Sequence, residues 1–163
     1  YISGEISTVV LLVNPTRDYV HNIIKTLQPS FLQFHGDETP KFCNQFDYPY
    51  IKAIRVSPDL NIERAIEHFN PKGGFLFDTW HPKKYGGTGG TFDWDVLPNE
   101  LKAPKILAGG LTSTNVGQAI KIARPDVVDV SGGVESLKGI KDERLIANFV
   151  DSVGSADMKI YKK

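Results

Sequence analysis

One stretch, residues 74–94, constrains the fold more than any other part of the chain. It reads Gly-Phe-Leu-Phe-Asp-Thr-Trp-His-Pro-Lys-Lys-Tyr-Gly-Gly-Thr-Gly-Gly-Thr-Phe-Asp-Trp. Its apolar start, residues 74–77, is typical of a strand buried on both faces. Asp78 ends that strand, and the carboxyl ends of parallel strands carry the chemistry of α/β proteins. The loop that follows has four glycines, so its backbone amides can come close to a ligand. The stretch predicts an α/β protein with a functional site at the end of this strand.

Apolar segments of strand length alternate with amphipathic segments of helix length along the chain. The expected strands are 6–13, 31–34, 50–54, 74–77, 105–108 and 127–130. The expected helices are 16–27, one that begins at Pro40 behind a Thr39 cap, 59–69, 113–122 and 142–153. This alternation is typical of a parallel sheet with helical crossovers, and it fits both a doubly wound sheet and a barrel.

Composition excludes several classes of protein. A chain of 163 residues is most simply one domain. Lys and Arg together number 19, as do Asp and Glu, so the charge balance predicts no nucleic-acid partner and no anionic membrane. The single cysteine, Cys43, cannot form an internal disulfide, which favours a reducing compartment. No apolar run reaches the roughly 18 residues of a membrane span, and the first residues do not read as a signal peptide. We therefore expect a cytoplasmic protein.

Paired glycines follow each of the last two predicted strands. One pair is Gly109 and Gly110, and the other segment is Ser131, Gly132 and Gly133. Either pair alone is more often a tight turn. Two such loops after the last two strands favour a barrel, where they bind phosphate through backbone N–H groups beside a helix N-terminus. The spacing from Gly133 to Gly139 leaves room for a small extra helix.

These motifs together resemble the phosphoribosylanthranilate isomerase family, (β/α)8-barrel enzymes of tryptophan biosynthesis. The family pattern is a hydrophobic strand, an Asp, a linker and Gly-Gly-Thr-Gly-x-Thr-Phe-Asp-Trp, found here at 75–78 and 86–94. The resemblance continues at 32–38, 106–111 and 129–135, and covers nearly the whole chain from about residue 5. It implies an isomerase that converts N-(5'-phosphoribosyl)anthranilate to 1-(2-carboxyphenylamino)-1-deoxyribulose 5-phosphate by an Amadori rearrangement. The partner is then a small phosphorylated molecule, with no cofactor and no metal, and monomer and homodimer both stay open.

The resemblance also implies roles for single residues. Asp78 is the general acid that protonates the ribose ring oxygen, a role that requires a carboxyl able to keep its proton. His35 and Asp129 correspond to substrate-binding positions. Arg55 is a candidate by its place after the third strand, where it could contact the anthranilate or the phosphate. Without the resemblance, Asp78 could be a turn former, His35 a packed histidine, Arg55 a surface arginine, and Asp129 a cap for backbone amides.

The glycine-rich loop is either a connector or a lid that excludes water from the site. The lid residues are Gly86, Gly87, Thr88 and Gly89, and Phe92 and Trp94 are expected to pack beneath them. The chain departs from the family pattern at Gly90, where a larger polar residue is common. It departs again at Gly132, where a second serine is usual and could donate a hydroxyl to the phosphate.

The family's general base is a cysteine in a Lys-x-Cys-Gly segment on the first strand, which these 163 residues do not contain. Cys43 does not match that segment. It falls in the predicted helix after Thr39, in the outer layer, where packing is its expected role. The arginine that binds the anthranilate carboxylate would directly precede Tyr1.

An eight-stranded barrel requires two more strands than the chain shows. In the family, the first two strands lie before a segment like Tyr1-Ile2-Ser3, and a helix separates that segment from the next strand. We expect one N-terminally incomplete barrel domain over residues 1–163, without the first two strands and the second helix. A genuinely shortened chain is the alternative. An omitted helix predicts Cα atoms near Ser3–Gly4 farther apart than the ~3.8 Å of a trans peptide.

Two other functions fit the pattern. One is another phosphate-binding barrel enzyme, such as a relative of indole-glycerol-phosphate synthase, which would carry a catalytic lysine inside the barrel. Lys52 and Lys105 are the candidates by position. The other is a non-catalytic remnant that only binds a phosphorylated ligand.

Overall fold

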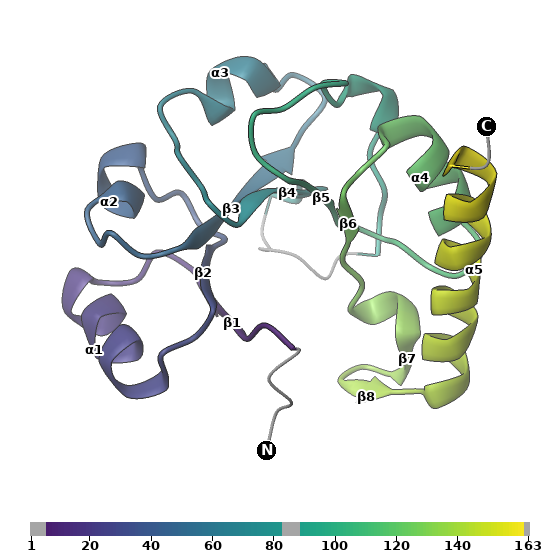
Figure 1. The fold of residues 1–163 in the computed structure, drawn as a ribbon, viewed down its shortest axis with the longest axis horizontal. Coiled ribbons are helices and arrows are strands. Elements are labelled where there is room, and N and C mark those ends of the chain that lie inside the picture. Colours follow the sequence, from purple (N-terminus) through teal and green to yellow (C-terminus); the bar gives the residue numbers. More distant parts are fainter. Residues whose placement is uncertain (1–5, 83–88, 162–163) are drawn as a thin grey trace.

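The computed structural model describes residues 6–82 and 89–161, with side chains to residue 157. Six strands form one sheet in chain order, and every neighbouring pair is parallel. They are β1 (Val9–Leu12), β2 (Phe31–Phe34), β3 (Tyr50–Val56), β4 (Gly74–Thr79), β5 (Lys105–Leu107) and β6 (Val127–Val128). The sheet curves into an arc with its helices on the convex side (Figure 1). The predicted parallel sheet with helical crossovers is confirmed.

Five helices cover the outside of the sheet. They are α1 (Arg17–Leu27), α2 (Pro40–Asn44), α3 (Ile62–Ile66), α4 (Val116–Ala123) and α5 (Glu143–Tyr161). The predicted caps form: Thr16 accepts a hydrogen bond from the Tyr19 amide, and Thr39 accepts one from the Phe42 amide. The predicted helix over 59–69 was too long, because Asn61 caps the helix and starts it at Ile62.

The predicted strands differ from the observed ones mainly at their ends. The first strand begins only at Val9, and β6 has two residues where four were expected. By contrast, β3 and β4 each continue two residues further, so that Asp78 lies within β4.

The prediction of a small helix between Gly133 and Gly139 was wrong. One 3-10 turn (Gly132–Val134) leads into an antiparallel hairpin, β7 (Glu135–Leu137) and β8 (Ile140–Lys141). Glu135 at the start of β7 and Lys141 at the end of β8 form an ion pair, which ties the two strands together.

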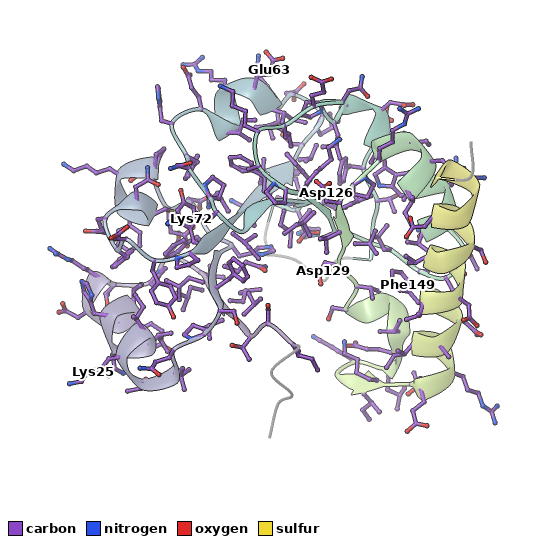
Figure 2. The ribbon with its side chains drawn as sticks, viewed as in Figure 1. Lys25, Glu63, Lys72, Asp126, Asp129 and Phe149 are labelled. Carbon is purple, nitrogen blue, oxygen red and sulfur yellow. The ribbon has the colours of Figure 1, made fainter. Side chains whose placement is uncertain are left out.

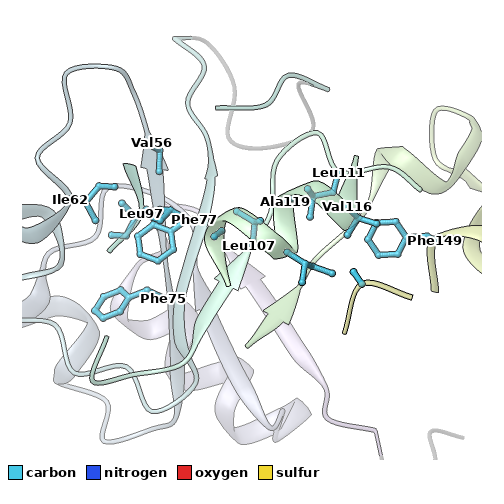
Figure 3. Close-up of a cluster of buried hydrophobic side chains, with 14 of the residues drawn as sticks. Val56, Ile62, Phe75, Phe77, Leu97, Leu107, Leu111, Val116, Ala119 and Phe149 are labelled. Atoms are coloured by element: carbon cyan, nitrogen blue, oxygen red, sulfur yellow. The ribbon is translucent and has the colours of Figure 1, made fainter. Parts of the chain in front are cut away.

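The sheet has two differently packed faces. Its outer face carries Phe75, Phe77 and Leu107, which belong to one buried cluster with Val116 of α4 and Phe149 of α5 (Figure 3). Its inner face carries a smaller cluster, namely Ile51, Ala53, Leu76, Ile106 and Ala108. Because side chains alternate along a strand, Asp78 shares the inner face with Leu76. This alternation decides which polar residues can reach the inside of the arc.

Within the described residues, β1 and β6 pair on one side only. Apolar side chains at these two edges are exposed, including Leu11 (55 %) and Val127 (49 %). The structure thus shows a six-stranded half barrel. The expectation about the spacing at Ser3–Gly4 lies outside the described residues. Over residues 6–82 and 89–161, no helix combines the length and the apolar character needed to cross a bilayer.

Candidate active site

The carboxyl ends of β4, β5 and β6 surround a hollow of about 360 Å³. Its wall contains the predicted acid, both glycine loops and one further carboxylate. These groups belong to Asp78, Gly109, Gly110, Asp129, Ser131, Gly132 and Gly133. These residues are up to 55 positions apart in the sequence, from 78 to 133, and the parallel sheet brings them to one edge. The predicted acid and the predicted phosphate loops therefore face the same space.

Asp78 is buried at the inner end of β4, with 6 % of its surface exposed. Its Oδ1 accepts a hydrogen bond from the Thr79 amide at 2.8 Å. Its Oδ2 lies 3.1 Å from Nε2 of His35. The other ring nitrogen of His35, Nδ1, lies 2.9 Å from Nε2 of Gln33. Protein groups thus hold both oxygens of the carboxyl in place at the wall of the hollow.

His35 does not line the hollow itself. It is 5 % exposed and contacts Asp78 from the side of β2. Gln33 was not singled out from the sequence. It lies in the segment 32–38 that resembles the family, and its spacing of two residues from His35 places both side chains on the same face of a strand.

The two glycine loops approach other backbone segments closely. A Cβ on Gly110, which has φ +61°, would overlap the carbonyl of Gly90, and a Cβ on Gly133 would overlap the carbonyl oxygen of Leu111. Side chains hold the first loop at the start of α4: the Asn115 amide donates to the Gly110 carbonyl, and its Oδ1 accepts from the Thr112 amide. The loops are therefore built so that backbone groups border the hollow.

Lys141 lies beside the second loop and was not foreseen from the sequence. Its Nζ donates to the Ser131 carbonyl at 2.9 Å, to Ser131 Oγ at 3.1 Å and to Glu135 at 2.8 Å. Hydrogen bonds to Gly139 and Lys141 lower the pKa of Glu135, with the Lys141 contact the larger cause. This places an ammonium group next to the loop that is expected to bind phosphate.

Asp129 follows β6 on the concave side of the sheet (Figure 2). It is one of the residues that line the hollow. Loss of solvation among the surrounding protein atoms raises the pKa of its carboxyl, and repulsion from Asp78 raises it further. His35 and Lys141 act in the opposite direction. The side chain is nonetheless open to the hollow, so a bound ligand could contact it.

Replacing Asp129 with asparagine is expected to stabilise the fold at neutral pH. The folded-state pKa of Asp129 lies above its ordinary value of 3.8, so its ionisation destabilises the folded state as pH rises through that range. Thermal unfolding should show a higher Tm for Asp129→Asn at pH 7, and a difference that shrinks toward pH 3.8. The exposed Asp95→Asn is the control, with no such change. A lower Tm of Asp129→Asn at neutral pH would contradict the electrostatic argument.

Arg55 pairs with Asp37 at the same end of the sheet. It is the register partner of Asp78 on the neighbouring strand, which puts it on the inner face. It is not among the residues that line the hollow, so its contact with a substrate stays a prediction.

Lys52 and Lys105, the candidate barrel lysines, both lie on the outer face, and that prediction was wrong. Lys52 Nζ donates to the carbonyls of Phe34 and Gly36 and to Glu38. Lys105 Nζ donates to the carbonyl of Ala123, at the end of α4. Both residues belong to strands that are buried on both faces, so the sequence does not show which of their side chains face inward.

Cys43 lies in α2, buried in the outer cluster with Phe34 and Tyr50. Burial raises the pKa of its thiol to about 12, so the group is protonated at neutral pH. The structure therefore places it in the outer layer and away from the hollow.

Of the predicted lid, Gly86, Gly87 and Thr88 lie outside the described residues. Gly89 borders the hollow, and the Gly90 carbonyl accepts a hydrogen bond from Thr79 Oγ1 at 2.8 Å. Phe92 and Trp94 are partly buried against the main core.

Comparison with known proteins identifies the family. The family model "N-(5'phosphoribosyl)anthranilate (PRA) isomerase" matches residues 2–152. The chain belongs to the N-(5'-phosphoribosyl)anthranilate isomerase family. It is 47 % identical to the isomerase of Neisseria meningitidis serogroup C over 145 residues, which are 89 % of this chain and 70 % of that protein. It is 49 % identical to the isomerase of Pseudomonas syringae pv. tomato over 148 residues, 91 % of this chain and 72 % of that protein.

Solved phosphoribosylanthranilate isomerases share the fold. The Thermotoga maritima enzyme superimposes with a TM-score of 0.81 at 32 % identity, over 94 % of this chain and 76 % of that one. A second isomerase structure is in complex with reduced 1-(o-carboxyphenylamino)-1-deoxyribulose 5-phosphate. It superimposes with a TM-score of 0.74 at 28 % identity, over 94 % of this chain and 74 % of that one. The family resemblance seen in the sequence is confirmed.

Proposed function

We propose that this isomerase acts on N-(5'-phosphoribosyl)anthranilate in tryptophan biosynthesis, with Asp78 as the general acid. The observation that carries this assignment is the shared hollow, where the buried carboxyl of Asp78 faces the glycine loops at Gly110 and Gly133. A ligand with a phosphate at one end can bind the loops while its ribose lies near the carboxyl. The related structure that contains the reduced product, itself a 5-phosphate, supports a phosphorylated ligand.

The reaction requires an acid, a base and a phosphate-binding site, here called the phosphate clamp and formed by the loops at 109–110 and 131–133. Backbone N–H groups of the two loops hold the phosphate, and Lys141 holds the second loop in place through its contacts with Ser131. Asp78 gives its proton to the ribose ring oxygen as the bond from that oxygen to C1' breaks, which leaves a protonated Schiff base. A base then removes the C2' proton to give the enolamine, which tautomerises to the ketone. The 163 residues contain no Lys-x-Cys-Gly segment for this base, and Cys43 lies elsewhere.

We further propose that the half barrel is part of a single (β/α)8 domain. Two more parallel strands between the outer edges of β6 and β1 would pair both edges and cover exposed side chains such as Leu11 and Val127. A cytoplasmic location fits the single reduced cysteine. Monomer and homodimer both remain open, although a related T. maritima isomerase is described as dimeric.

The lysine-dependent alternative is not favoured, because both candidate lysines donate to backbone carbonyls on the outer face. A non-catalytic phosphate-binding protein would share the clamp but not need Asp78. Measuring turnover together with ligand binding separates this case from the isomerase.

Serine at position 132 tests the phosphate clamp. A Cβ at Gly132 would have no atom within 4 Å, so Gly132→Ser should fold normally and place a hydroxyl beside the phosphate. One added hydrogen bond contributes about 0.5–1.5 kcal/mol, or roughly a two- to tenfold lower Kd. Titration calorimetry with ribose 5-phosphate measures the effect, and ribose without phosphate should show none.

Gly132→Ala is the matched control, because it adds the Cβ without the hydroxyl and should bind like the wild type. At the next position, Gly133→Ala would force the loop away from Leu111, at a cost of about 1–3 kcal/mol in the free energy of unfolding. Its ribose 5-phosphate binding should be lost. Equal affinities for Gly132→Ser and Gly132→Ala would argue against phosphate at this loop.

A further inference from the structure

Three buried polar side chains form a chain of hydrogen bonds behind the hollow. Gln33 and His35 lie two residues apart on the inner side of β2, and Asp78 lies at the end of β4. Their exposed fractions are only 8 %, 5 % and 6 %. A buried array of this kind is costly unless every donor meets an acceptor, so the positions of its protons are constrained.

The hydrogen-bond geometry points to the atom of His35 that carries the proton. Gln33 presents its amide nitrogen to Nδ1 of His35, and an amide nitrogen can only donate. With this arrangement Nδ1 accepts, and a ring with a single proton carries it on Nε2. That proton is directed at Oδ2 of Asp78, 3.1 Å away.

The alternative tautomer would change the behaviour of Asp78. With its proton on Nδ1, His35 would present a bare nitrogen to the carboxyl, and a protonated Asp78 would donate to that nitrogen. With the proton on Nε2, both carboxyl oxygens already accept hydrogen bonds, from His35 and from the Thr79 amide. An acidic proton on Asp78 then has no acceptor among these neighbours and stays available to a ligand in the hollow.

We propose that Gln33 is a positioning residue that fixes His35 as a hydrogen-bond donor and thereby directs the proton of Asp78 toward the hollow. The consequence for catalysis rests on the proposed function, whereas the tautomer is a property of the resting protein. A glutamate at position 33 could not serve, because a carboxylate would accept from Nδ1 and favour a doubly protonated ring. Such an imidazolium would stabilise the ionised form of Asp78 and remove the acid.

Nitrogen-15 NMR of histidine-labelled protein tests the proposal without any need for turnover. At about pH 8, where ordinary imidazoles are mostly neutral, wild-type His35 should show a neutral ring protonated on Nε2. Gln33→Met keeps the length of the side chain but cannot donate, so the Nε2–H pattern should be lost or mixed with the Nδ1–H pattern. Gln33→Glu should give the doubly protonated pattern. His35→Asn assigns the signals.

Gln118→Met, on the exposed side of α4, is the matched control and should leave the His35 signals unchanged. Backbone amide spectra verify that each variant is folded, and Gln33→Leu, which also cannot donate, replaces Gln33→Met if that variant does not fold. In turnover assays, Gln33→Met should lower kcat with little change in KM. A wild-type ring protonated on Nδ1, or a Gln33→Met ring identical to wild type, would overturn the proposal. A correct tautomer in a protein that does not isomerise its substrate would instead refute the proposed function.

Discussion

Replacing Asp78 with asparagine is expected to lower kcat for N-(5'-phosphoribosyl)anthranilate by about 10²–10⁴-fold, the usual contribution of a positioned general acid. Asparagine has nearly the same size and keeps one oxygen that can accept the hydrogen bond from Thr79 or His35. It cannot give a proton to the ring oxygen. The loss should therefore appear in kcat, and the protein should remain folded.

Ligand binding separates this chemical effect from a structural one. The phosphate loops do not depend on the charge of Asp78, so the Kd for ribose 5-phosphate should change little in Asp78→Asn. Asp59→Asn is the matched control, since Asp59 is exposed in the turn that follows β3 and does not border the hollow. An Asp78→Asn enzyme with nearly the wild-type kcat would exclude Asp78 as the acid.

Much of the site was predictable because parallel sheets bring the carboxyl ends of their strands to one edge. The strand that carries Asp78 could be found from the sequence, and so could the glycine pairs at Gly109 and Gly132. Their meeting in one hollow followed from the fold class. Their individual roles in catalysis and in phosphate binding stay predictions.

Other features could not be predicted, for identifiable reasons. The contact between His35 and Asp78 joins residues 43 positions apart on strands that are not neighbours, so no local pattern reveals it. The hairpin after Gly133 is bridged by an ion pair between Glu135 and Lys141, six positions apart, which a search for a helix overlooks. The sequence does not show that the Lys52 side chain points outward, because its strand is buried on both faces.

The outward direction of Lys52 has a structural consequence. Lys52 is only 3 % exposed, and its ammonium group bonds to Glu38 at 2.9 Å and to the carbonyls of Phe34 and Gly36. The Glu38 carboxylate in turn accepts from the backbone amides of Asn14 and Gly36. This network joins the loops that follow β1 and β2, directly beside the backbone of His35.

Lys52→Met is therefore expected to lower the free energy of unfolding by about 3–5 kcal/mol, because it leaves the carboxylate of Glu38 buried without its counter-charge. Urea unfolding followed by circular dichroism measures the change. The same substitution frees the carbonyls around His35, so the His35 nitrogen signals should broaden or shift as well.

The double variant Lys52→Met/Glu38→Gln distinguishes a lost ion pair from lost packing. Glutamine keeps an oxygen that can accept from the Gly36 amide and carries no charge, so the double variant should be more stable than Lys52→Met alone. The exposed pair of Glu67 and His68, 3.6 Å apart, supplies the surface control. Glu67→Gln should change stability by at most about 0.5 kcal/mol. If Lys52→Met cost no more than this surface variant, the buried pair would not hold the two loops, and the position of His35 would have to depend on Gln33 and Asp78 alone.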